Sequence, residues 1–92
     1  MELEFLFKVK SDEQFNRTIK MLNRLGYVWA TDFPKEPTFK ECKSFYHSNS
    51  KLLIHTFYNN ITNKKEMCAT TMTTLKSYPQ YKRKEFCILE IR

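Results

Sequence analysis

The chain has 92 residues, among them eight Phe, five Tyr and one Trp, and it carries a net charge of +6. It contains neither an apolar run of about 20 residues nor a basic leader before an apolar stretch, which excludes a membrane span and a signal peptide, so we expect a cytoplasmic protein. Its length predicts one domain over residues 1–92, and a concentration of the positive charge in residues 47–92 favours an anionic partner.

The first predicted element is a strand near the beginning of the chain. Every second residue from Leu3 to Val9 is apolar, and most of the positions between them are charged. A repeat of two residues is typical of a strand that buries one of its faces.

A helix is predicted directly after this strand. Ser11 and Gln14 have the spacing of a capping box at its start, and Gly26, the only glycine of the chain, predicts its end in a left-handed conformation. Apolar residues recur on one face of this helix, at Phe15, Ile19, Leu22 and Leu25.

The remaining elements are predicted to be strands joined by turns and one proline-containing loop. In chain order they are a short strand at 27–29, a loop at 31–38, a hairpin of Lys43–His47 with Leu52–Tyr58, a turn at 59–60, a strand within 66–75 and a strand at 85–91. Four threonines argue against a second helix at residues 70–78. Residues 85–91 are apolar on both faces, which predicts an interior strand. The predicted fold class is α+β, with one helix on a mixed or mostly antiparallel sheet of four to six strands in the order β-α-β-β-β-β.

The sequence predicts neither catalysis nor a cofactor. His47 and His55 are the only candidates for a general base near neutral pH, and the predicted hairpin register places them on opposite faces of a sheet. A single glycine excludes a glycine-rich phosphate loop. The three cysteines are widely spaced, which disfavours a metal site or disulfide framework and predicts reduced thiols.

Three basic clusters are candidates for binding phosphate groups. Their members are Arg17, Lys20 and Arg24 on one helix face, Lys64 and Lys65, and the run of Lys82, Arg83 and Lys84. Basic groups beside tyrosines are able to follow a nucleic-acid backbone and stack on its bases. The alternative is a solvated helix face with ordinary polar turns.

The aromatic residues divide into a predicted core and a predicted protein interface. The expected core members are Phe5, Phe7, Phe15, Phe45 and Phe86. The expected interface members are Trp29, Phe33 and Phe39 around the proline-containing loop, and Tyr78 and Tyr81 beside the last basic cluster. Exposed aromatic side chains are frequent anchors of protein interfaces. The alternative for the loop is that it folds over the edge of the sheet.

The first third of the chain resembles a group of small proteins encoded by bacteriophages and prophages. The resemblance lies in the opening strand Phe5-Leu6-Phe7-Lys8-Val9-Lys10 and in the helix end Leu25-Gly26-Tyr27-Val28-Trp29. It implies a small accessory protein that acts by binding host machinery or a host defence system, and it carries no catalytic residue onto this sequence.

Two functions follow from these observations as hypotheses. The first is a phage-type binding protein that inhibits or redirects a host factor, such as a nuclease-based defence complex, by surface contact. The second is a nucleic-acid or nucleotide-binding module that uses the basic helix face and Lys82–Lys84.

Overall fold

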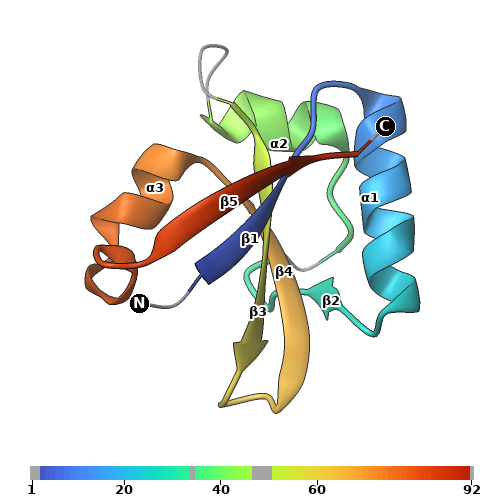
Figure 1. Cartoon of the computed structure of the whole chain (residues 1–92). Helices are drawn as coiled ribbons and strands as arrows, with labels where there is room; N and C mark the ends of the chain where they lie inside the picture. Colours follow the sequence, from blue (N-terminus) through green and yellow to red (C-terminus); the bar gives the residue numbers. More distant parts are fainter. Residues whose placement is uncertain (1–2, 34, 47–50, 92) are drawn as a thin grey trace.

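The computed structural model describes residues 3–33, 35–46 and 51–91. Its elements are, in chain order, β1 (Leu3–Lys8), α1 (Asp12–Arg24), β2 (Val28–Trp29), α2 (Phe39–Tyr46), β3 (Leu53–Asn59), β4 (Lys64–Thr70), α3 (Met72–Ser77), the 3-10 helix η1 (Pro79–Tyr81) and β5 (Glu85–Glu90). The strands form one sheet of five strands in the order β2-β4-β3-β1-β5 (Figure 1). One main helix on a mixed sheet confirms the predicted α+β class.

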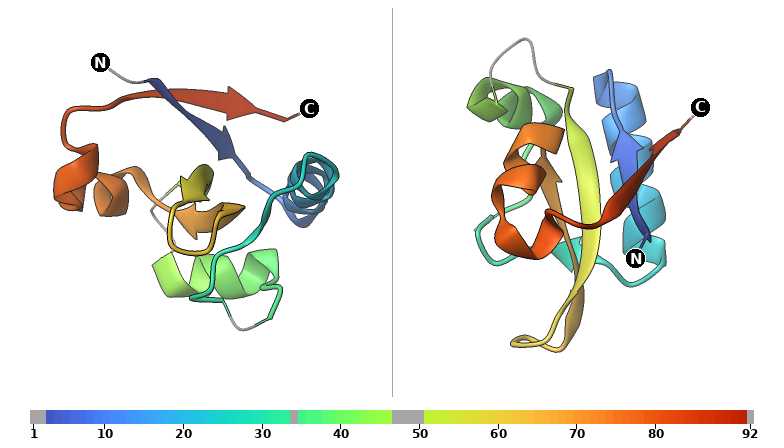
Figure 2. Two further views of the ribbon diagram at one scale, coloured as in Figure 1. Left: turned by 90° about the horizontal axis from the view of Figure 1, so that it is seen from below. Right: turned by 60° about the vertical axis from the view of Figure 1, so that its left-hand side comes forward.

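The sheet combines both kinds of strand pairing. The central strand β3 lies antiparallel to β1 and to β4, whereas the outer strands β5 and β2 run parallel to β1 and β4. A larger core cluster joins α1 and α2 to one face, and a smaller cluster of Leu6, Leu53 and Leu75 joins α3 to the other. The helices therefore surround the β3–β4 pair, while β5 lies at the outer margin of the molecule (Figure 2).

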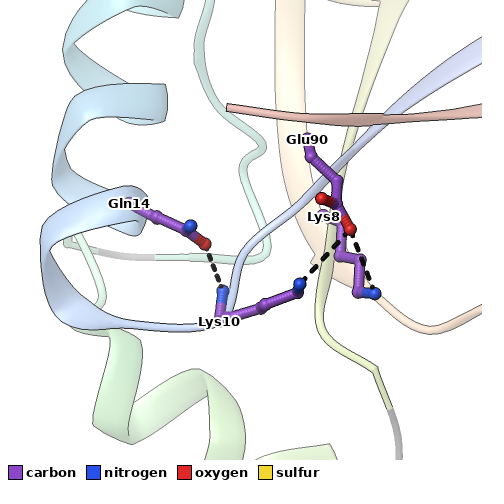
Figure 3. Close-up of polar contacts among 4 residues, drawn as sticks. All are labelled: Lys8, Lys10, Gln14 and Glu90. Atoms are coloured by element: carbon purple, nitrogen blue, oxygen red, sulfur yellow. Dashed lines mark hydrogen bonds and ion pairs between the residues drawn. The ribbon is translucent and has the colours of Figure 1, made fainter. Parts of the chain in front are cut away.

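The start of α1 follows the sequence prediction closely. The Ser11 hydroxyl accepts a hydrogen bond from the Gln14 backbone N–H at 3.2 Å, as an N-cap residue does. The Gln14 side chain accepts in return from the backbone N–H of Lys10, one residue earlier than in the standard capping box (Figure 3). These two bonds fix the point at which the chain leaves β1 and begins the helix.

The end of α1 is set by Gly26, which has a φ of +92°. The Tyr27 N–H donates to the Leu22 carbonyl at 3.0 Å, and the Gly26 N–H donates to the Asn23 carbonyl at 3.1 Å. This pair of bonds defines a Schellman motif, which turns the chain back toward the sheet. The prediction of a left-handed glycine at the end of this helix is confirmed.

The predicted strand Lys43–His47 is wrong in its described part, because residues 39–46 form α2. Phe39 and Cys42 are buried one turn apart, and Tyr46 packs against the same core. This spacing of three and four residues is helical, and Thr38 caps the helix by accepting from the Glu41 N–H. His47 and the predicted turn at 48–50 lie outside the described residues.

The predictions for residues 66–78 and for the position of the last strand in the sheet are also wrong. The predicted strand within 66–75 ends at Thr70, and α3 occupies the segment where four threonines disfavoured a helix. Thr71 explains the difference, because its hydroxyl accepts from the Thr74 N–H and caps the helix. The last strand is present, but β5 lies at an edge of the sheet and not in its interior.

Two predicted core residues are exposed. Phe5 is 46% exposed and Phe45 is 76% exposed, whereas Phe15 is buried and Phe7 and Phe86 pack against the core clusters. Neither residue belongs to a core cluster, because Phe5 lies beside the outer strand β5 and Phe45 extends from α2 next to Tyr46 and away from the larger cluster.

Candidate binding groove

A groove opens between α2 and the α3–η1 segment, over the face of β3 and β4 that α3 covers in part. Its volume is about 1030 Å³. Its floor is formed by His55 and Phe57 of β3 and Cys68 of β4, which the strand register places on one face. Neighbouring helices α2 and α3 flank this strand pair (Figure 2), so the walls of the groove come from segments far apart in the sequence.

His55 is the most deeply buried polar residue of the floor, with 1% of its surface exposed. Its ring stacks on Phe57 at a centroid distance of 5.5 Å and meets the edge of Tyr81 at 5.2 Å. Its Nε2 has no hydrogen-bond partner among the described residues and lies 3.6 Å from Oε2 of Glu4. Burial lowers the pKa of His55 in spite of this carboxylate. The imidazole is therefore neutral at neutral pH.

Glu4 is already engaged by a second partner. The Lys84 ammonium donates to Oε1 of Glu4 at 2.7 Å and lies 5.0 Å from the centre of the Tyr81 ring. Lys84 therefore balances the charge of the carboxylate, and its own positive charge further lowers the pKa of His55. The result is a small closed polar cluster beneath one end of the groove.

Cys68 of β4 lies directly opposite His55 of the neighbouring strand β3, on the same face of the sheet. Burial, assisted by the negative charges of Asp32 and Glu66, raises the pKa of the Cys68 thiol to about 12. At neutral pH this sulfur is a protonated thiol next to a neutral imidazole. A thiol nucleophile needs the opposite arrangement, with a low pKa and a cationic or basic neighbour. All three cysteines of the chain are free.

The α2 wall of the groove is aromatic and acidic. The Tyr46 hydroxyl donates to the Ala69 carbonyl at 2.6 Å, which fastens α2 to the edge of β4. Phe45 meets the Tyr46 ring edge-on at 4.9 Å, and Asp32 and Glu41 lie on the same side. The lining contains two carboxylates and no Lys or Arg among the described residues. The groove thus differs in charge from a chain whose net charge is +6.

The opposite wall is rich in threonine and tyrosine. It consists of Thr70, Thr71, Thr73, Thr74, Leu75, Tyr78, Gln80 and Tyr81. Tyr78 is 49% exposed, and its ring meets that of Tyr81 edge-on at 6.5 Å. Hydroxyl groups and exposed aromatic rings are suited to contacts with a polypeptide that has both polar and apolar side chains.

Three of the five predicted interface aromatics line this groove, namely Phe33, Tyr78 and Tyr81. Trp29 lines a different hollow, and Phe39 is only 8% exposed because it packs in the larger core cluster. The loop of residues 31–38 therefore contributes to the groove wall, while the two aromatics that flank it pack mainly inward. Phe45 and Tyr46, which the sequence reading did not propose for a site, belong to the groove, and the helical spacing of Phe39, Cys42 and Tyr46 was the signal that could have found them.

The predicted basic residues do not line the groove, and they are distributed over several elements. Arg17 pairs with Glu13 on α1, Lys65 of β4 lies 5.7 Å from the centre of the Tyr27 ring, and Lys64 is exposed at the start of β4. Lys82, Arg83 and Lys84 follow η1. Lys20 and Arg24 line a hollow of about 480 Å³ beside Trp29, together with Asn16, Asn23 and Glu36.

Comparison with family models, curated proteins and solved structures gave no match to this chain. No group of three or more His, Cys, Asp or Glu side chains in the described ranges is arranged to hold a metal ion. Across the same residues, no helix combines the length and apolar character that crossing a bilayer requires.

Proposed function

We propose that this chain is a binding protein that inhibits or redirects a host factor by surface contact, without catalysis and in the host cytoplasm. The resemblance of its first third to small phage-encoded proteins supports a host protein or nucleoprotein complex, such as a nuclease-based defence complex, as the target. The groove between α2 and α3 is the observation that carries the proposal, because exposed aromatic anchors and hydroxyl groups converge there.

The chemistry of the groove favours a particular kind of partner segment. Asp32 and Glu41 at one wall, with no described Lys or Arg in the lining, disfavour a polyanion in the groove itself. The rings of Phe45 and Tyr78 offer apolar and cation–π contacts. We therefore propose a partner segment that combines apolar residues with Lys or Arg.

A pull-down from bacterial lysate tests this proposal when it compares three forms of the tagged protein. Phe45→Ser with Tyr78→Ser removes the two most exposed aromatic rings of the groove, while Ile61→Ser removes an apolar side chain that is 93% exposed in the β3–β4 turn. We expect one specific protein partner with the original chain and with Ile61→Ser. The groove variant should bind at least roughly thirtyfold more weakly, as for a loss of about 2 kcal/mol. Recovery of no specific partner, or equal recovery by all three forms, would refute the proposal.

A second candidate function is the binding of nucleic acid or a nucleotide. The hollow where Lys20 and Arg24 lie beside Trp29 favours it, because a base is able to stack on an aromatic ring while the basic groups contact phosphate. The single Trp of the chain makes its fluorescence a direct probe. Titration with single-stranded DNA should quench this fluorescence, and the affinity should fall linearly with salt on a log–log plot. Fluorescence that stays unchanged, even at low salt, would dispose of this function for the hollow.

A further inference from the structure

The sheet has an uncovered apolar surface at its β1–β5 side. Leu3, Phe5 and Leu89 are 52%, 46% and 38% exposed, and the register of the two strands places them on one face together with Cys87. On the opposite face of β5, Ile88 is 43% exposed. Figure 1 shows β5 crossing the front of the molecule with no helix drawn over it. Large apolar side chains are therefore exposed on both faces of the outermost strand.

The backbone of β5 is also unprotected. It is the last strand of the described sheet, so one side of its backbone pairs with β1 and the other has no neighbouring strand. Natural edge strands are usually blunted by proline, by a lysine or by a bulge. Residues 85–90 contain neither proline nor lysine, and their pairing with β1 is continuous from Leu3–Glu85 to Lys8–Glu90. The two charged residues of β5, Glu85 and Glu90, stand at its ends, so the apolar middle of this edge is open to a further strand.

We propose that β5 pairs antiparallel with β5 of a second copy, around a twofold axis that passes beside Cys87. In this register Cys87 lies opposite the partner's Cys87, and Phe86 lies opposite the partner's Ile88. Because the axis is perpendicular to the sheet, each face of one copy continues into the same face of the other. The exposed apolar surfaces of Phe5 and Leu89 in the two copies then form one continuous face of the joined sheet.

The charges of the strand agree with this register. Glu90 lies opposite the partner's Lys84, and Glu85 lies opposite the partner's Leu89, so no acidic residues face each other. Within one chain, Glu90 is paired with Lys8 and Lys10, each at 3.3 Å (Figure 3). These lysines hold the pKa of Glu90 below its usual range, so the carboxylate is charged but locally balanced. Its presence at the end of the edge does not repel a second copy.

The match of β5 with itself favours a second copy over an unrelated chain. A twofold axis needs a strand that complements its own reverse. Around Cys87 this condition is met because the apolar Phe86 lies opposite the partner's Ile88 and the acidic Glu90 lies opposite the partner's basic Lys84. The interface consists of one strand pair and a few side chains, which is small compared with about 1,200 Å² for stable complexes, so we expect a concentration-dependent dimer. The groove lining contains no residue of β1 or β5, so the groove remains accessible in the dimer.

Sedimentation velocity over a broad range of protein concentrations tests the dimer. We expect the original chain to shift from monomer to dimer as its concentration rises. Cys87→Lys with Ile88→Lys places like charges directly opposite each other at the axis and should leave a monomer. Leu25→Lys with Ile61→Lys is the matched control, because it adds the same charge at residues that are 57% and 93% exposed elsewhere. A monomer at all concentrations, or a dimer that survives the β5 substitutions, would overturn the proposal.

Cross-linking at Cys87 tests the register. Residues directly opposite in an antiparallel pair have Cα atoms about 4.5–5.5 Å apart, which is within the range for a disulfide. Mild oxidation with a copper–phenanthroline complex removes two electrons and two protons from the two thiols. It should give a covalent dimer of the original chain and of Cys42→Ala, but none of Cys87→Ser. A dimer in sedimentation that gives no cross-link through Cys87 would exclude this register.

Discussion

At single positions, the backbone conformation of Gly26 gives the most direct prediction. Its φ of +92° is strained for any residue with a Cβ, although a Cβ built there meets no atom within 4 Å. Gly26→Ala should therefore lower the free energy of unfolding by about 1 kcal/mol through backbone strain alone. Gly26→Asn should cost less, because asparagine adopts the left-handed conformation more readily. Urea denaturation of the two variants measures the difference, and equal stability of the alanine variant and the original chain would contradict the assignment.

His55 makes stability depend on pH. Because burial lowers its pKa in the folded state below the usual 6.5, the unfolded chain binds the proton more readily. The contribution of neutral His55 to the free energy of unfolding is fully present above about pH 6.5. It falls as the pH drops toward the lowered pKa of the folded state, by up to about 1.4 kcal/mol per pH unit. Denaturation curves at several pH values should show this loss, and His55→Phe should remove that part of the slope. A slope that the substitution leaves unchanged would assign the effect to other groups.

At the level of secondary structure, the elements that could be predicted are those whose sequence signals lie within the element itself. The helix α1 has a cap, a periodic apolar face and a terminal glycine within one short stretch, and each of these features is present in the structure. The helices α2 and α3 lack such a combination. Intrinsic preferences of Phe, Tyr and Thr favoured strands there, and packing of Cys42 and Leu75 against the sheet overrode them.

The groove could not be predicted from local sequence signals either, because its walls come from elements that only the tertiary structure brings together. Tyr78 and Tyr81 were predicted as interface residues from their place beside the last basic cluster, but their position opposite α2 follows only from the tertiary structure. The pairing of His55 with Cys68 was missed because the predicted hairpin assigned β3 to the wrong neighbour. A strand's register cannot be read from its own residues when both faces are apolar, as they are at the start of β3.

The N-cap residue Thr71 stabilises the start of α3. Its hydroxyl accepts from the Thr74 N–H at 3.2 Å and lies 2.9 Å from the Thr74 hydroxyl oxygen. Thr71→Ala should destabilise the protein by about 1 kcal/mol, whereas Thr71→Ser should retain most of the stability. Thr73→Ala on the exposed side of the same helix is the control and should be neutral or slightly stabilising, since alanine has the higher helix propensity. Thermal unfolding of the three variants compares them, and an equal effect at both positions would argue against the cap.

Across the whole molecule, the two faces of the sheet are unequally supported. The larger cluster contains ten buried residues, whereas the smaller one contains three, of which Leu75 is the only one from α3. Met72 of α3 and Tyr81 of η1 pack against the smaller cluster but are only partly buried. Since η1 buries no residue and α3 buries only Leu75, the α3–η1 segment has few buried apolar side chains to expose when it opens. Segments of this kind open at a lower free energy than the global transition.

Hydrogen exchange should reveal this difference. We expect the backbone amides of residues 72–81 to exchange before those of β3 and β4, and Leu75→Ala to accelerate exchange in that segment while exchange in β4 changes little. If the amides of α3 exchanged only with global unfolding, the unequal support would be disproved. Because α3 forms one wall of the groove over His55, its opening also widens the groove. We therefore expect the groove to have a firmly packed wall at α2 and a more easily displaced wall at α3, so that the proposed partner segment enters without disturbing the larger core.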